Sequence, residues 1–356
     1  MTVLIYRRNL LAYSETFIAA QSGHLRRYRP YFIGRSRMQG IDLPEDRVAL
    51  SKKEAPLVEL TGRWPGLAER LGGASVRLVH AHFEGGGVAM YPLARRLGVP
   101  LVTTCHGWDV TADDAARWPN PALRWLYRHR RRSLQREGAL FIAVSEHIRK
   151  KMLALGYPPE RTIVHYIGVD TERFKADAAL ERERIVLFVG RLVEKKGCAY
   201  LIEAMRGIDA RLVIIGDGPL RGQLEAMAPR AEFLGAQPGD AVKRWMNRAR
   251  VFCLPTVRAA NGDMDGCPIV FFEAQAMGLP VVAFASGGTP EAVADGETGL
   301  LAQECDTVGL AARLARLLNS DEEWGRLSAR ARARVESDFD IVKQCEKLEA
   351  IYDALA

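Results

Sequence analysis

Arg191 and Lys196 are the first residues whose types and spacing suggest chemistry. They lie in the segment VGRLVEKKG, directly after the apolar run Ile185–Gly190. Ligands of open parallel sheets bind at the carboxyl ends of the strands. Two cations at such a place suit a pyrophosphate, because arginine offers a planar fork of donors and lysine a point charge. The alternative is a solvated basic turn.

The segment GDMDGCPIVFFEAQ contains two carboxylates, Asp265 and Glu273, at a spacing that places one in a loop and one on a helix. We expect the helix to begin near Pro268, with Glu273 two turns along it. Free backbone N–H groups at a helix start can hold hydroxyls or phosphate oxygens. A carboxylate on the inward side of the helix can accept hydrogen bonds from a ribose diol. The alternative is a surface loop before an amphipathic helix.

A third segment, TTCHGWD, places His106 after a strand rich in β-branched residues. Gly107 allows a sharp turn there, and Asp109 follows. A lone histidine is usually structural, but this position at the end of a strand makes His106 a candidate for function. His80 and His82 alternate along an earlier strand with no third metal ligand beside them, so we interpret them as packing residues.

The segment YSETF follows the first apolar run and suggests the start of a helix at Ser14 and Glu15. Serine is a favoured N-cap residue, which is sufficient to explain its presence structurally. Contact with an acceptor molecule is the alternative.

Two further patterns resemble ligand motifs but fit them poorly. Asp263 and Asp265 form the D-x-D pattern that binds a metal–nucleotide complex in some enzymes, but matches of three residues are common by chance. The segment GDGPLRG resembles the dinucleotide fingerprint, but Arg221 occupies the place of the third glycine. Pro219 fits the first position of a helix instead. We therefore expect neither a metal site nor a nicotinamide site.

The elements that must position these residues follow one repeated pattern. Short apolar or β-branched runs alternate with amphipathic segments of helical length, and the pattern occurs twice. It predicts an α/β fold with parallel sheets covered by helices on both faces. The expected strands are Thr2–Tyr6, Pro30–Gly34, Arg77–His82, Val99–Cys105, Ala139–Ser145 and Thr162–Ile167, then Ile185–Gly190, Arg211–Gly216, Glu232–Gly235, Val251–Thr256, Pro280–Ala285 and Thr298–Ala302.

We place the domain boundary in the polar segment KADAALERER, which has too few apolar residues to hold a core together. The expected domains are residues 1–177 and 178–340. The last third of the second half predicts three successive helices, Thr307–Leu318, Asp321–Glu336 and Ile341–Ala356. We expect the final one, residues 341–356, to return to the first domain.

Composition limits the class of protein. The chain has 356 residues, of which 48% are hydrophobic and 26% charged, as in a globular protein of two domains. No apolar run approaches the ~20 residues needed to span a bilayer. The N-terminal MTVLIYRR places apolar residues before arginines, the reverse of a secretory signal, so we expect a cytoplasmic protein. The six cysteines form no C-x-x-C pair and are expected to be reduced and structural.

Positive charge is concentrated in the first half of the chain. Residues 1–175 carry 28 Lys and Arg against 16 Asp and Glu, whereas residues 176–356 carry 22 against 27. The first half is therefore expected to meet something anionic. The basic stretch Arg124–Leu134, with Trp118 and Trp125 nearby, suits contact with an anionic membrane surface, and a solvated helix face is the alternative. Nucleic acid is not expected, because no recognition motif accompanies the charge.

Taken together and in this order, the motifs resemble glycosyltransferase family four, a group of retaining enzymes with the GT-B architecture. The resemblance covers nearly the whole chain, through YSETF, HAHF, CHGWD, VSEHI, IGVDTERF, VGRLVEKKG, IIGDGP, DGCPIVFFEA, GLPVVA and GGTPE. The GDMDGCP segment is most similar to enzymes that assemble exopolysaccharides of the colanic-acid or amylovoran kind. The resemblance implies two facing Rossmann-like doubly wound domains, the first for an acceptor and the second for a nucleotide-sugar donor.

The resemblance also implies a role for each matching residue. Arg191 and Lys196 would bind the donor pyrophosphate and stabilise the leaving nucleoside diphosphate. Glu273 would bond the ribose hydroxyls, Asp265 would hold hydroxyls of the donor sugar, and His106 would lie beside the transferred sugar. The full donor-binding set is Gly190, Arg191, Lys196, Gly266, Cys267, Pro268, Ile269 and Glu273, and the acceptor-binding set is Ser14, Glu15 and Asp109.

Two departures from the family pattern matter. The family usually has Glu where this chain has Asp265, which is one methylene shorter and bears on the identity of the donor sugar. The usual P-N-G-V-D segment is replaced by the residues His165 to Asp170, so the asparagine contact of that linker is missing.

The implied function is transfer of a hexose from a UDP- or GDP-sugar to a saccharide acceptor, with a lipid-linked polysaccharide intermediate expected. Cations and amides would stabilise the departing diphosphate, so no metal or other cofactor is expected. The expected location is cytoplasmic, at the inner face of the plasma membrane. One alternative is a non-catalytic nucleotide-sugar-binding subunit. The other is a nucleotide-sugar epimerase or dehydrogenase, which needs an intact fingerprint and a Tyr-x-x-x-Lys pair that the sequence lacks.

Overall fold

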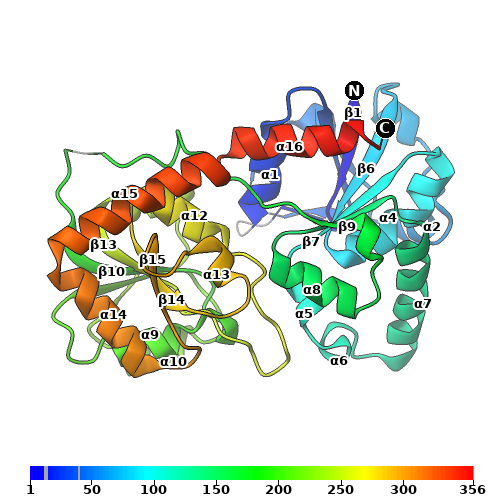
Figure 1. Cartoon of the computed structure of the whole chain (residues 1–356). Helices are drawn as coiled ribbons and strands as arrows, with labels where there is room; N and C mark the ends of the chain where they lie inside the picture. Colours follow the sequence, from blue (N-terminus) through cyan, green and yellow to red (C-terminus); the bar gives the residue numbers. More distant parts are fainter. Residues whose placement is uncertain (12–14, 39–40, 178, 356) are drawn as a thin grey trace. The chain divides into compact units, whose positions relative to one another are not determined.

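The computed structural model describes residues 1–11, 15–38, 41–177 and 179–355 (Figure 1). The chain divides into two compact units, each built on its own parallel sheet. The N-terminal unit comprises Met1–Gly168 together with Ile341–Ala356, and the C-terminal unit comprises Val169–Asp340.

The N-terminal unit contains a seven-stranded sheet in the order β5-β3-β1-β6-β7-β8-β9, and all its neighbouring pairs are parallel. Its strands are β1 (Thr2–Tyr6), β3 (Arg29–Gly34), β5 (Val48–Leu50), β6 (Val76–His82), β7 (Leu101–Cys105), β8 (Leu140–Ala143) and β9 (Thr162–Val164). The short strands β2 (Asn9–Leu10) and β4 (Ser36–Arg37) form a separate parallel pair. Because the strands are parallel, the residues that follow β1, β6 and β7 lie at one edge of the sheet.

Helices cover both faces of this sheet. On one face α4 packs against β6 and β7 and also contacts α2 and α7, while α1 and α16 lie side by side over the other (Figure 1). The helical segments are η2 (Glu45–Arg47), α2 (Ala55–Thr61), α3 (Leu67–Arg70), α4 (Glu84–Leu97), α5 (Trp108–Thr111), α6 (Asp114–Arg117), α7 (Pro121–Glu137), α8 (Glu146–Ala154) and η3 (Pro159–Arg161), with α1 (Thr16–Gly23) and α16 (Ile341–Asp353) opposite α4.

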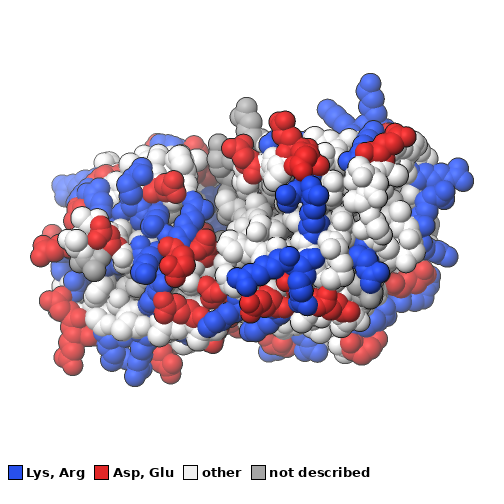
Figure 2. Space-filling view, turned by 90° about the horizontal axis from the view of Figure 1, so that it is seen from above, with Lys and Arg blue, Asp and Glu red and all other residues white. Residues whose placement is uncertain are grey.

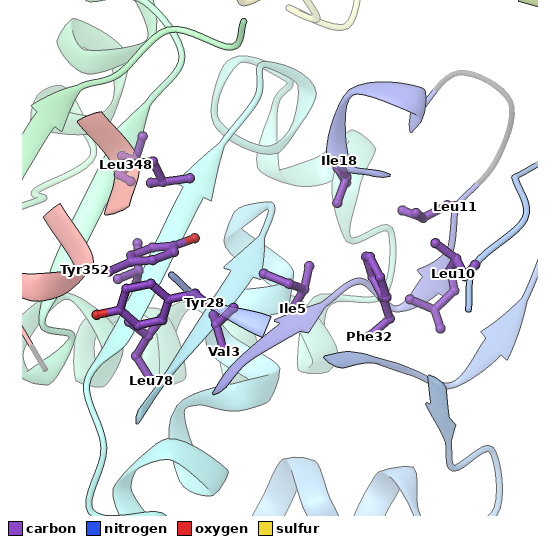
Figure 3. Packing of buried hydrophobic residues seen from close by; sticks show 13 residues of the cluster. Val3, Ile5, Leu10, Leu11, Ile18, Tyr28, Phe32, Leu78, Leu348 and Tyr352 are labelled. Atoms are coloured by element: carbon purple, nitrogen blue, oxygen red, sulfur yellow. The ribbon is translucent and has the colours of Figure 1, made fainter. Parts of the chain in front are cut away.

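The last helix, α16, is built into the core of the N-terminal unit. Leu348 and Tyr352 pack with Tyr28 and the sheet residues around Leu78 (Figure 3). The buried carboxylate of Glu349 accepts hydrogen bonds from three consecutive backbone N–H groups, those of residues 26, 27 and 28, at 2.8, 2.6 and 3.2 Å. The helix is therefore a structural part of the unit that the start of the chain forms.

The C-terminal unit contains a six-stranded parallel sheet in the order β12-β11-β10-β13-β14-β15. Its strands are β10 (Glu183–Val189), β11 (Arg211–Ile215), β12 (Glu232–Phe233), β13 (Ala249–Cys253), β14 (Val281–Phe284) and β15 (Gly299–Ala302). Its helical segments are η4 (Glu194–Lys196), α9 (Cys198–Ala204), α10 (Arg221–Met227), α11 (Gly239–Arg248), α12 (Ile269–Ala276), α13 (Thr289–Ala292), α14 (Thr307–Asn319) and α15 (Asp321–Asp338). The central strands β10 and β13 are neighbours, so the loops that follow them meet at the carboxyl edge of the sheet.

The division between the units falls after Gly168, whereas the sequence placed it at residues 177/178. The segment that begins at Val169 is already attached to the C-terminal unit. The Thr171 hydroxyl donates to Asp340 at 2.6 Å, and Arg332 donates to the carbonyl of Phe174 at 2.6 Å. Composition pointed to the more polar stretch further on, but these side-chain and main-chain contacts decide where the second unit begins.

Charged side chains of both signs are spread over the surface. On the described residues of the face in Figure 2, Lys and Arg side chains are interspersed with Asp and Glu over both units. The positive excess of the first half therefore does not gather into one patch on this face.

All six cysteines are free thiols, and four of them are buried. Within the described ranges no helix is long and apolar enough to cross a bilayer.

Candidate functional site

The loop that carries Arg191 is fixed against the loop after β11. The Leu192 backbone N–H donates to the Asp217 carbonyl at 2.9 Å. Gly216 has φ +136°, and a Cβ there would lie 1.9 Å from the Gly190 carbonyl oxygen, so only glycine allows this approach. The glycines of the GDGP segment thus have a structural explanation in the packing of these two loops.

Lys196 lies at the end of η4, and the next residue fixes its place. Gly197 has φ +65°, and a Cβ there would lie 1.8 Å from the Pro255 carbonyl oxygen. The Val257 N–H also donates to the Lys195 carbonyl at 2.9 Å. These contacts hold the loop after β10 against the loop after β13, which brings the lysines to the aspartates of GDMDG.

Four charged residues meet there, and we call them the lysine–aspartate cluster: Lys195, Lys196, Asp263 and Asp265. The Lys196 ammonium donates to Asp265 at 2.7 Å, and the Lys195 ammonium lies 3.0 Å from Asp263 and 3.4 Å from Asp265. Each of the four side chains is only 8–14% exposed. Burial raises the pKa of Asp265, but the two ammonium groups outweigh it and hold that pKa below its ordinary value. Asp265 is therefore an ionised acceptor in the free protein.

Asp263 differs from its neighbour, because burial raises the pKa of its carboxyl and the Lys195 ammonium only partly opposes the rise. Both aspartates of the D-x-D pattern thus have lysine partners. Within the described residues no group of three or more His, Cys, Asp or Glu side chains could hold a metal ion.

Arg191 contrasts with these lysines. Its side chain is exposed and makes no hydrogen bond or ion pair with any other residue in the described part of the chain. It lies close enough to Asp263 to oppose, with Lys195, the rise that burial causes in that residue's pKa. The guanidinium is therefore available to an anionic ligand at the carboxyl end of β10.

Helix α12 carries Glu273, and Pro268 is its N-cap. The helix begins at Ile269, so Glu273 lies just beyond the first turn and not two turns along, as expected from sequence. Burial raises the pKa of the Glu273 carboxyl to about 7, and Arg173 opposes this rise. No hydrogen bond to the carboxylate occurs among the described residues. A partly buried carboxyl without a partner is suited to accept hydrogen bonds from a ligand.

The loop before α12 is supported from a neighbouring segment. The Gly288 N–H donates to the Asp265 carbonyl at 3.3 Å. Gly266 and Pro268 are buried, and Cys267 is half-buried. Ile269 is the first residue of an eight-residue helix, so its N–H and that of the next residue are free of helical hydrogen bonds. The expected contact of Gly266, Cys267, Pro268 and Ile269 with a donor stays a prediction.

In the N-terminal unit three histidines lie in a row. His80 and His82 stack with ring centroids 4.5 Å apart, and His82 Nδ1 lies 3.0 Å from His106 Nε2. His80 is also bonded to Thr104 and Tyr352, at 2.6 and 2.5 Å. Burial, with smaller contributions from His80 and a nearby arginine, lowers the pKa of His106 to about 3. His106 is therefore a neutral imidazole at neutral pH.

Asp109 fixes the backbone of the His106 loop. Its Oδ1 accepts from the N–H groups of His106 and Gly107 at 3.0 and 2.9 Å, and its Oδ2 accepts from the Glu84 N–H at 2.8 Å. Asp109 is 3% exposed, so its carboxylate is fully used inside the protein. This geometry makes it a support for the loop, whereas its expected contact with an acceptor stays a prediction.

Glu15 lies at the same edge of the sheet. Its carboxylate receives hydrogen bonds from Arg7 at 2.6 and 3.0 Å, and Arg7 in turn lies 4.1 Å over the ring of Phe83. The rings of Phe17 and Phe83 approach His106, with centroids 4.9 and 4.6 Å away. Ser14, the other residue expected to bind an acceptor, lies outside the described residues.

Sequence inspection missed Lys195, Arg7 and Phe83 as parts of these two sites, and it considered Asp263 only as a possible metal ligand. Lys195 stands one position from Lys196, which was singled out, and Arg7 directly follows the first strand. Position relative to a strand end was the signal that could have identified Arg7. Nothing in the sequence indicated that Lys195 would pair with Asp263.

The basic stretch Arg124–Leu134 lies in α7, and its arginines divide between two faces. Arg130 donates to the Glu59 carbonyl of α2, and Arg128 donates to Asp114 at 2.7 Å. Trp125 is 70% exposed and stacks on His129 with centroids 5.9 Å apart. Part of the positive charge is thus used within the unit, while a tryptophan and exposed basic residues face outward.

Comparison with solved structures identifies the fold. The chain aligns over its whole length with Alr3699/HepE from Anabaena, solved in complex with UDP and glucose, with a TM-score of 0.78 at 20% identity and full coverage of both chains. A sucrose-phosphate synthase from Thermosynechococcus elongatus gives a TM-score of 0.77 at 18% identity, over 100% of this chain and 99% of that one. The fold is that of the GT-B glycosyltransferases, with two parallel-sheet α/β domains.

Sequence comparison identifies the family. The profile for "Glycosyltransferase Family 4" matches residues 16–173, and that for "Glycosyl transferases group 1" matches residues 183–320. The putative colanic acid biosynthesis glycosyltransferase WcaL of Salmonella typhimurium is 34% identical over 73% of this chain and 66% of its own length. The amylovoran biosynthesis glycosyltransferase AmsK of Erwinia amylovora is 32% identical over 80% of this chain and 71% of its own length. The chain belongs to glycosyltransferase family 4 and is a glycosyltransferase.

Proposed function

We propose that this glycosyltransferase transfers a hexose, with retention, from a UDP- or GDP-sugar to a saccharide acceptor in polysaccharide assembly. The observation that carries the proposal is the arrangement at the carboxyl edge of the C-terminal sheet. There Arg191 and the Glu273 carboxyl, both without a hydrogen-bond partner among the described residues, and the Lys196–Asp265 pair come from the segments that follow two adjacent strands. This set supplies the charges and acceptors that a nucleoside diphosphate sugar requires.

Each residue has a part that its chemistry supports. Arg191 and Lys196 bind the pyrophosphate, since both are cations at a strand end. Glu273 accepts hydrogen bonds from the ribose diol. Asp265 accepts from hydroxyls of the donor sugar, and the free N–H groups at the start of α12 bind a further oxygen.

The bond between the anomeric carbon and the diphosphate oxygen would break while the acceptor hydroxyl attacks that carbon from the same face. The hydroxyl proton would pass to the departing diphosphate. Negative charge grows on the departing diphosphate, and the cations Arg191 and Lys196 stabilise it. Because these two cations do this, we propose that no divalent metal is needed. The neutral His106 can accept or donate a hydrogen bond at a sugar hydroxyl without adding charge.

The acceptor is proposed by analogy with the relatives. Two of them are named for colanic acid and amylovoran biosynthesis, and others are named as phosphatidylinositol monomannoside mannosyltransferases that depend on GDP-mannose. We propose a saccharide attached to a lipid carrier, bound at the edge of the N-terminal sheet that holds Glu15 and His106.

A lipid-linked acceptor requires the enzyme to work at the inner face of the plasma membrane. The outward side of α7, with Trp125 and Arg132, is the proposed contact with anionic lipid, since each basic residue near such a surface adds about 1 kcal/mol of attraction. Co-sedimentation with vesicles tests this. Binding to phosphatidylglycerol vesicles, loss of that binding in Trp125→Ser/Arg132→Glu and no binding to phosphatidylcholine would support the contact.

The function is tested first by ligand-induced thermal shifts with UDP, GDP and ADP and their sugars, with and without EDTA. A bound ligand raises Tm by mass action. The proposal expects one base to be preferred, the shift to survive EDTA and the shift to fall in Arg191→Met. Arg206→Met is a matched control, because that arginine is exposed and follows the C-terminal end of α9, away from the strand-end loops. No shift with any nucleotide would count against donor binding.

A non-catalytic nucleotide-sugar-binding subunit is the second candidate. The pairing of Lys196 with Asp265, at a position where the family usually has Glu, is the observation that favours it. Donor hydrolysis and transfer assays separate the two, because a binding subunit shows the thermal shift without any release of nucleoside diphosphate.

A further inference from the structure

Phe83 has an unusual backbone conformation at the edge of the N-terminal sheet. Its φ is +67°, a value that residues with a Cβ rarely adopt, and its N–H donates to the Thr104 carbonyl at 2.7 Å. In this conformation the ring contacts His106, with centroids 4.6 Å apart, and the Arg7 guanidinium covers it at 4.1 Å. Strained residues of this kind persist only where the surroundings hold them in place.

The next residue, Glu84, is fixed in place by the hydrogen bonds of its side chain. Its side chain is fully buried, and its carboxylate accepts hydrogen bonds from Tyr127 at 2.6 Å, Tyr157 at 2.8 Å and Arg117 at 2.9 Å. Arg131 adds its charge from 3.8 Å. The partners come from α6, α7 and the segment after α8, so one side chain joins three parts of the unit.

The backbone of Glu84 is tied to the His106 loop. Its N–H donates to Asp109 Oδ2 at 2.8 Å, and Asp109 Oδ1 accepts from the N–H of His106 at 3.0 Å. The buried Glu84 carboxylate thus fixes the backbone at Phe83 and Glu84. From there the Phe83 ring contacts His106, and Asp109 connects the Glu84 N–H to the His106 N–H.

We propose that Glu84 is a positioning residue for the His106 site. Its buried hydrogen bonds hold Phe83 in its strained conformation and hold Asp109 under the His106 loop, and this sets the orientation of the imidazole. Glu84 does not touch the substrate itself. The kinetic part of the proposal rests on the function proposed above, whereas the effect on the orientation of His106 does not.

The test uses Glu84→Gln, which keeps the size of the side chain and removes the charge and one acceptor. Tyr157→Phe and Tyr127→Phe each remove a single hydrogen bond and serve if Glu84→Gln does not fold. Glu59→Gln is the matched control. That carboxylate also bonds an arginine, Arg35 at 2.8 Å, and a tyrosine hydroxyl, Tyr6 at 3.5 Å, in the same unit, but among the residues that the structure describes no hydrogen bond links it to the His106 loop.

The first readout needs no substrate. NMR spectra of protein with labelled histidine report the environment of each ring, and the His106 signals are assigned by their loss in His106→Asn. We expect Glu84→Gln to shift the His106 and His82 signals, Tyr157→Phe to shift them less, and Glu59→Gln to leave them in place. Unchanged His106 signals in folded Glu84→Gln protein would overturn the proposal.

The second readout is kinetic. We expect kcat for transfer to fall roughly 10- to 100-fold in Glu84→Gln, the scale of loss that a misplaced catalytic group causes. The Kd for the nucleoside diphosphate should stay within about twofold, because donor binding belongs to the other unit. The double variant Glu84→Gln/His106→Asn should be no slower than His106→Asn alone. If the two substitutions slowed transfer independently, so that their effects multiplied in the double variant, the proposal would be overturned. If the wild type transfers no sugar, the NMR result still decides the proposal.

Discussion

The Lys196 ammonium donates to Asp265 Oδ2 at 2.7 Å, so two residues expected to contact different parts of the donor are partners in the free protein. A diphosphate that binds Lys196 must compete with this carboxylate. We therefore expect Asp265→Asn to bind UDP or GDP as tightly as the wild type or a few-fold more tightly. Transfer should nevertheless fall by about 10²-fold, since the asparagine supplies no charge for the sugar hydroxyls. Calorimetry and initial rates measure the two effects.

The comparison for this variant is Asp263→Asn, which removes the other carboxylate of the lysine–aspartate cluster but leaves the Lys196–Asp265 pair. If Asp265→Asn weakened binding of the bare nucleoside diphosphate, the carboxylate would be needed to orient Lys196, and the idea of competition would be wrong.

Arg191 and Lys195 are expected to respond to substitution in opposite ways. Arg191 is exposed and makes no ion pair within the described residues, so Arg191→Met should leave Tm nearly unchanged. It should weaken nucleoside diphosphate binding by about 1.5–3 kcal/mol, or roughly 10- to 150-fold in Kd. Lys195 is 8% exposed and holds Asp263 at 3.0 Å, so Lys195→Met should lower the free energy of unfolding by about 1–3 kcal/mol. Thermal melts with and without nucleotide distinguish the two patterns, and a large Tm loss in Arg191→Met would show that it has a structural role.

The central strands were predictable because strands buried on both faces are nearly continuous apolar runs. The run expected at Ile185–Gly190 is β10, Glu183–Val189, and the run expected at Thr2–Tyr6 is β1 with the same bounds. The edge strand β5, of three residues, was missed because so short a strand leaves no periodic pattern.

The contacts inside the sites were harder to foresee. The neighbours of Lys196 and Asp265 in sequence gave no sign that the two would pair, because the pairing depends on the close approach of Gly197 to Pro255. Asp109 was expected to bind an acceptor from its motif, but its three backbone hydrogen bonds depend on how β6 and β7 end side by side. The motifs indicated which residues are candidates for function, and only the folded loops show which groups each residue contacts.

Asp109 provides a prediction that separates support from ligand contact. Its two oxygens accept three backbone N–H groups, and an asparagine would turn an NH2 group toward at least one of these donors. We expect Asp109→Asn to lower the free energy of unfolding by about 1.5–3 kcal/mol. Transfer should fall as well, because the His106 loop loses its support. Chemical denaturation measures the stability, and a variant with wild-type stability and a raised acceptor KM would instead indicate direct contact with the acceptor.

Glu273 predicts a pH dependence of nucleotide binding. Burial raises the pKa of its carboxyl to about 7 in the free protein, so the group is largely protonated below that pH. A ribose diol donates to the ionised form, so affinity should rise as pH increases through 7 and level off above it. If binding lowers the pKa well below 6, the Kd at pH 6 is about tenfold weaker than at pH 8. Glu273→Gln should bind more weakly at pH 8 and lack this part of the pH dependence, while protonation of the diphosphate itself affects both proteins equally. Isothermal titration of both proteins at the two pH values gives the difference, and parallel profiles would mean that Glu273 does not titrate with the ligand.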